Sequence, residues 1–134
     1  MRYRAAGVEA MRTRFALIAA TCALTALPAA AHHSFAIYDM SQNIEFEGVV
    51  DVVKLRNPHM AMTLVQTKAD GSKATINFVE GAPANMIVRL GLKPDDIAPG
   101  KKIKAIGAPR RDNPAEFFLK AVILPDGQKF SVIN

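Results

Sequence analysis

Hydrophobic and polar residues alternate over much of the chain beyond residue 43, which is typical of β-strands that bury one face. The alternation predicts strands at residues 44–55, 60–67, 74–78, 101–107, 116–124 and 129–133. Turn residues separate these segments. Asn57-Pro58 breaks the first strand, and Asp70-Gly71 is a hairpin signal between the second and third. The pattern therefore predicts a mostly β domain.

The first predicted strand is long and changes its buried side. Its first inward face consists of five residues: Ile44, Phe46, Gly48, Val50 and Val52. Beyond them Val53 and Leu55 place apolar groups on the other face. A strand that coils in this way is typical of a small barrel, and Gly48 is the predicted position of the bend.

The period changes between the third and fourth predicted strands. Pro83 suits the first position of a helix, and Gly91 suits the residue just past a helix end. Met86, Ile87 and Leu90 form an apolar stripe between them, so the segment predicts a helix of about two turns. Three strands, a short helix and further strands is the order of an OB-type β-barrel. We expect a five- to six-stranded barrel of this type, with a small β-sandwich as the alternative.

Residues 1–31 have the layout of a cleavable signal peptide. Arginines in the first 14 residues precede an uncharged run at residues 15–27, and small residues end the segment at Ala29 to Ala31. The apolar run is shorter than the ~20 residues that span a bilayer. Met11 is an alternative start. We therefore expect a signal peptide at 1–31, an N-terminal arm at 32–43, a barrel domain at 44–134, and a periplasmic or secreted protein.

Removing residues 1–31 changes the charge and the cysteine content. The net charge of the whole chain is +5, from 17 Lys and Arg against 12 Asp and Glu; four basic residues and one acidic residue lie in the signal. The remaining 13 and 11 leave a net charge of +2, so no nucleic-acid partner is expected. The single cysteine, Cys22, also leaves. No transmembrane segment and no catalytic pattern follow, which favours a binding protein over an enzyme.

The three histidines are the candidate metal ligands. If cleavage follows Ala31, His32 carries the free α-amine, and its amine and imidazole form a chelate. A second imidazole from His59 would complete the three-nitrogen set that suits copper. His33 offers a different mode, through the amine, an amide and its own ring. The alternative is that His59 hydrogen-bonds its own loop and the N-terminal histidines have no metal role.

Residues beside His59 add weaker candidates. Met60 and Met62 share one strand face, and thioether with imidazole selects Cu(I), although methionine is also an ordinary core residue. Asn57 is a candidate ligand-binding residue in the same loop. The rival to a copper protein is an interaction module that holds a peptide, a glycan or a periplasmic protein partner without metal.

The chain also resembles a known family. His32-His33-Ser34-Phe35, the triplet Asn57-Pro58-His59 and the segment Phe46 to Val50 are similar to those of small exported bacterial proteins classed as a domain of unknown function. The resemblance covers the whole mature chain and implies no established activity. In architecture alone, the plan is also similar to periplasmic copper and silver chaperones built on a small five-stranded barrel.

Overall fold

The computed structural model describes residues 33–133. The chain divides into two units, Met1–His33 and Ser34–Asn134, and the fold described below is that of the second unit. Six strands form it: β1 (Ile44–Lys54), β2 (Ala61–Thr67), β3 (Lys73–Glu80), β4 (Lys102–Pro109), β5 (Glu116–Ile123) and β6 (Lys129–Ser131). A short helix, α2 (His33–Ala36), precedes them. Among the described residues, no helix is long and apolar enough to cross a membrane.

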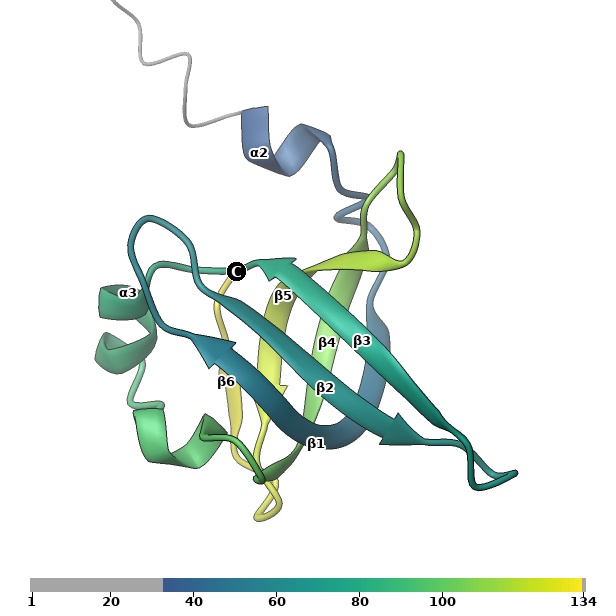
Figure 1. Ribbon diagram of the computed structural model, residues 1–134. Helices are drawn as coiled ribbons and strands as arrows, with labels where there is room; N and C mark the ends of the chain where they lie inside the picture. Colours follow the sequence, from purple (N-terminus) through teal and green to yellow (C-terminus); the bar gives the residue numbers. More distant parts are fainter. Residues whose placement is uncertain (1–32, 134) are drawn as a thin grey trace, which may run out of the picture. The chain divides into compact units, whose positions relative to one another are not determined.

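The first five strands close into a barrel (Figure 1). β1 pairs antiparallel with β2 on one side and with β4 on the other. β3 pairs antiparallel with β2 and parallel with β5, and β5 pairs back to β4. β6 adds one more strand to β5. This is the strand order of an OB-type barrel. The predicted barrel is confirmed, and the β-sandwich alternative is not the fold.

β1 changes its buried side at a β-bulge that follows Val50. Its pairing with β2 shifts register between Val50 and Val52, so one extra residue turns the strand. Val50 is buried, whereas Val52 is 42% exposed. The prediction that Val52 faces inward is therefore wrong. The bulge lies between Val50 and Val52, so Val53 packs against the core in place of Val52. Gly48 allows β1 and β2 to pack closely, since a Cβ there would meet the Val65 carbonyl oxygen at 2.8 Å.

The segment between β3 and β4 contains α3 (Ala84–Arg89) and a 3₁₀ turn, η1 (Pro94–Ile97). Gly91 has φ +90°, as its predicted place after the helix requires. Pro83 was predicted as the first helical residue but lies at the N-cap, one position before the helix begins at Ala84. The predicted apolar stripe is only partly buried: Ile87 enters the core, while Met86 and Leu90 are each 41% exposed. Because α3 is short, Ile87 is its only residue buried in the core. Leu92, which follows the helix, is buried in the same core.

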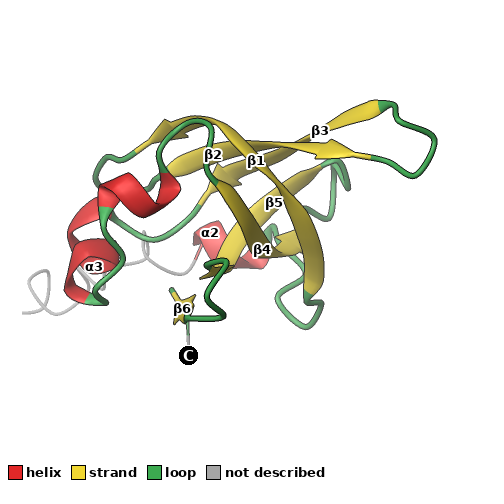
Figure 2. Cartoon of the chain, turned by 90° about the horizontal axis from the view of Figure 1, so that it is seen from below, coloured by secondary structure: helices red, strands yellow, loops and turns green. Residues whose placement is uncertain are grey.

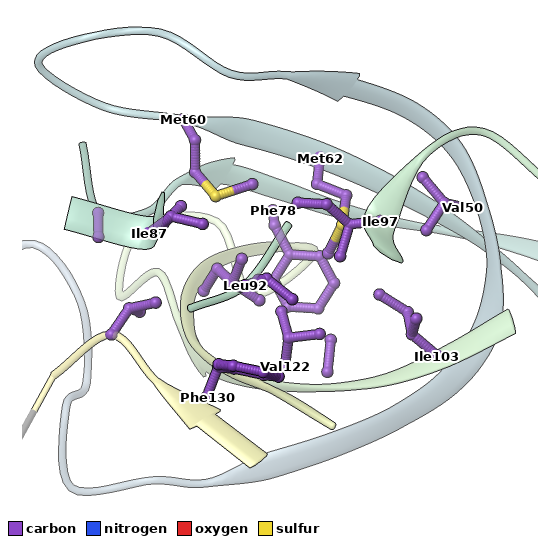
Figure 3. Close-up of a cluster of buried hydrophobic side chains, with 14 of the residues drawn as sticks. Val50, Met60, Met62, Phe78, Ile87, Leu92, Ile97, Ile103, Val122 and Phe130 are labelled. Carbon is purple, nitrogen blue, oxygen red and sulfur yellow. The ribbon is translucent and has the colours of Figure 1, made fainter. Parts of the chain in front are cut away.

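The main core fills the barrel interior. Figure 3 shows Met60 near Ile87 and Met62 near Ile97, with Phe78 between them and the side chains of Leu92 and Val122. Phe130 of the last strand belongs to the same cluster. Figure 2 shows α3 at one end of the barrel and the β2–β3 hairpin projecting at the other. The helical segment therefore closes one end of the core, because its apolar residues pack on the side chains inside the barrel.

A second, smaller core lies on the outer face of β4 and β5. It joins Tyr38, Ala108 and Phe118, with Met40 packed against them. Tyr38 forms an isolated antiparallel bridge with Arg110, and the Asp39 amide donates to the Pro109 carbonyl at 2.8 Å. The chain before β1 therefore packs on the barrel. This contact explains why β5 is the most apolar strand: both of its faces are covered.

Candidate functional site

The site is built around His59, in the loop between β1 and β2. β1 ends at Lys54, Asn57 and Pro58 lie in the loop that follows, and the Met60 amide donates to the Ala82 carbonyl at 3.1 Å. This bond places the loop beside the end of β3. Met60 points into the core, so its neighbour His59 lies at the surface, with a side chain that is 45% exposed.

One nitrogen of the His59 ring faces the end of β3. Nδ1 lies 3.2 Å from the Gly81 carbonyl oxygen and 3.3 Å from Glu80 Oε1. A carbonyl oxygen only accepts hydrogen bonds, so this contact places the proton on Nδ1 in the neutral ring. The other nitrogen, Nε2, then carries the free lone pair. In a ring this exposed, that lone pair is available to a ligand.

Glu80 is the inner member of the site. Its side chain is 15% exposed, and Oε2 accepts a hydrogen bond from the Tyr38 hydroxyl at 3.1 Å. Oε1 is buried and has no hydrogen-bond partner among the described residues, although it lies within ion-pair distance of His59 Nδ1. The Nδ1–H instead points to the Gly81 carbonyl. The carboxylate therefore acts on the imidazole through its charge at close range.

Tyr38 brings the N-terminal segment to the same site. The side chain is 2% exposed, and its ring packs edge-on against Phe118 with centroids 5.4 Å apart. Burial raises the pKa of the Tyr38 phenol above its usual range, and the charge and hydrogen bond of Glu80 raise it further. The phenol therefore stays protonated and donates to Glu80. Tyr38, Glu80 and His59 form a chain of contacts that we call the Tyr–Glu–His network.

Gly81 lets this network lie directly over the core. The residue is buried, and a Cβ there would meet Met60 Cγ at 2.9 Å and Leu119 Cβ at 3.3 Å. Only glycine lets the end of β3 approach Met60 this closely. The carbonyl that accepts from His59 is therefore held in place by the packing beneath it.

The other predicted site residues lie in different environments. His32 lies outside the described residues, and His33 is the first residue of α2. Asn57 is exposed, and its Oδ1 accepts from the Asn85 amide at 3.5 Å, so its side chain faces the start of α3. Over residues 33–133, no group of three or more His, Cys, Asp or Glu side chains is placed to hold a metal.

Met60 and Met62 share a strand face, as the spacing predicts. That face is the interior, where the two side chains are 1% and 2% exposed within the main core (Figure 3). Their sulfur atoms fill space between apolar groups, as methionine commonly does in cores. His59 points the other way, because neighbouring residues along an extended chain face opposite sides.

Sequence reasoning missed Glu80 and Tyr38. Glu80 is the last residue of β3, and the pairing of β3 with β5 shifts register between Phe78 and Glu80. This irregularity breaks the alternation, so strand periodicity by itself does not show which way the carboxylate faces. Tyr38 gives no sequence signal of the contact, since its partner is 42 residues away in the sequence.

A comparison with known families gives one match. It covers residues 20–117, most of the chain, including β1 to β4 and the loop that carries His59. The chain belongs to a family of unknown function, DUF6152. The predicted membership of a family of unknown function is thereby confirmed. No curated protein and no solved structure matches this DUF6152 member at a significant level.

Proposed function

We propose that this DUF6152 member is an exported binding protein that holds a copper ion and catalyses no reaction. His59 Nε2 is the ligand from the barrel, and the α-amine and imidazole of His32 are the other nitrogen ligands. The observation that carries the proposal is the orientation of His59. Metal-binding histidines almost always direct their other ring N–H to a carbonyl or carboxylate. His59 does so toward Gly81, with Glu80 adjacent.

Covalent geometry supports the contribution of His32. Tyr38 is anchored by its hydrogen bond to Glu80, which in turn lies beside His59. The chain from Tyr38 back to residue 32 is six residues, a reach of at most about 20 Å when extended. A tether of this length is compatible with His32 and His59 binding the same ion. His33 remains the alternative source of an imidazole on the same short tether.

The chemistry of the ligand set supports copper among the common metals. Imidazole and amine nitrogens suit Cu, Ni and Zn, and copper binds most tightly of these by the Irving–Williams order. The predicted signal peptide would deliver the protein outside the cytoplasm and create the free amine on His32. Export and the first ligand therefore depend on the same cleavage.

The test is a calorimetric titration with Cu(II) of a chain that begins at His32, its N-terminal mass checked first. We expect His59→Gln to weaken binding at least tenfold, because one of three nitrogens is lost. Acetylating the α-amine of His32 should weaken it similarly, because a blocked amine can no longer chelate the metal. His33→Ala is the matched control and should bind as the parent does. Equal affinity for all four proteins would overturn the proposal, and a loss with His33→Ala alone would favour the His33 mode.

A second candidate function has its own observation. The outer face of β1 to β3 carries a hollow of about 270 Å³ whose lining includes Val52, Ala61, Thr63, Asn77 and Val79. OB-type barrels bind ligands over strands 2 and 3. A binding module without metal would use this hollow. NMR shift changes confined to these residues on adding a peptide or glycan, with none on adding Cu(II), would favour it.

A further inference from the structure

We infer that Glu80 and Tyr38 are positioning residues that hold His59 in the tautomer with its proton on Nδ1. The inference rests on the proposed function in one respect: it names the groups that prepare His59 Nε2 for a metal. It also makes a statement about the metal-free protein. The network is therefore testable even if no metal binds.

The position of Glu80 gives its carboxylate a defined effect. Oε1 lies 3.3 Å from His59 Nδ1, and the Gly81 carbonyl lies 3.2 Å from the same atom. Both oxygens carry negative charge toward Nδ1. A lone pair on Nδ1 would face both of them, whereas a proton there is attracted by both. In the partly buried environment of Glu80 this preference is stronger than it would be in water. The free lone pair is thereby assigned to Nε2.

Tyr38 keeps Glu80 in that position. Its hydroxyl donates to Oε2 at 3.1 Å, which leaves Oε1 directed toward His59. The phenol itself has little freedom, because the side chain is 2% exposed and packs against Phe118. Without the hydroxyl, Oε2 would lose its partner and the carboxylate would be free to rotate. Tyr38 therefore acts on His59 only through Glu80.

A purely structural role is the competing explanation. The chain before β1 is also held by Lys120, whose Nζ donates to the Met40 carbonyl at 2.8 Å and to the Gln42 carbonyl at 3.3 Å. Lys120 holds the same segment without contacting Glu80 or His59. Lys120→Met is thus a matched control that loosens the segment and leaves the network in place.

The experiment compares the parent with Glu80→Gln, Tyr38→Phe and Lys120→Met. The first readout is the ¹⁵N shifts of the His59 ring in the metal-free protein at about pH 8.5, two units above the usual histidine pKa. We expect the Nδ1–H tautomer in the parent, a reduced population of it in Glu80→Gln, where only the Gly81 carbonyl still favours it, and a smaller reduction in Tyr38→Phe. Lys120→Met should match the parent.

The second readout is Cu(II) affinity of the same proteins. Removing groups that orient a metal ligand typically costs about 10–100-fold in affinity. We expect a loss in that range for Glu80→Gln and a loss of several-fold for Tyr38→Phe. Unchanged tautomer populations in both variants would overturn the inference, as would an equal change in Lys120→Met. If the parent binds no copper but the tautomer changes appear as expected, the proposed function fails and the positioning role stands.

Discussion

Phe118→Ala tests whether the second core holds the N-terminal segment on the barrel. Phe118 is 2% exposed, and its ring contacts Tyr38 and Phe35 from that segment, with centroids 5.4 Å away in each case. Burying a phenylalanine contributes about 2–3 kcal/mol by the transfer of its apolar surface from water. The N-terminal segment forms one wall of the resulting cavity. This segment can move inward and fill part of the cavity, so the cavity adds little to the loss of stability. We expect the free energy of unfolding to fall by about 3 kcal/mol, near the lower end for Phe→Ala.

Urea denaturation measures the change, and chymotrypsin reports its location. Cleavage after Tyr38 should become fast in Phe118→Ala, since the segment loses its main apolar contact while the barrel core remains intact. Phe35→Ala is the matched control: that ring is 42% exposed, and only an aromatic pair of about 1 kcal/mol is lost. A loss below 1 kcal/mol for Phe118→Ala, or unchanged cleavage at Tyr38, would refute the assignment of this cluster as the anchor of the segment.

Three further predictions follow from single residues. In a chain beginning at His32, Tyr38 is the only tyrosine, so alkaline absorbance titration reads its phenol directly; its midpoint should lie above the usual ~10. As the pH rises, the unfolded state loses the phenol proton at a lower pH than the folded state does. The stability contributed by Tyr38 is therefore complete below pH ~10 and declines at higher pH. A titration midpoint at the usual ~10 would contradict the raised pKa. Gly48→Ala should lower the free energy of unfolding by about 1–3 kcal/mol, because the new Cβ would lie 2.8 Å from the backbone oxygen of Val65. An unchanged thermal or urea melt would show that β1 and β2 can move apart there without loss of stability. Met62→Leu should cost less than about 1.5 kcal/mol and leave Cu(II) affinity unchanged, whereas a loss of affinity would make its thioether a ligand.

The local course of the chain was predictable because it depends on neighbouring residues. Alternating side chains predicted the strands, and Asp70-Gly71 predicted the β2–β3 hairpin, where Gly71 has φ +83°. Gly91 marked the residue after the helix for the same reason, since its backbone conformation favours glycine. The order of these elements was sufficient for the barrel topology.

The contacts between distant residues were decided only by the tertiary structure. The bulge that exposes Val52 depends on the register with β2, and the burial of Phe118 depends on a segment 80 residues away. His59 was recognisable as a candidate ligand by its type alone. Its tautomer and orientation come from Glu80 and Tyr38, which reach it only when the barrel closes. The sequence by itself determined the strands, turns and candidate ligand chemistry, because these follow from residue type and spacing. The tertiary structure decided which side chains meet, because long-range packing selects their partners.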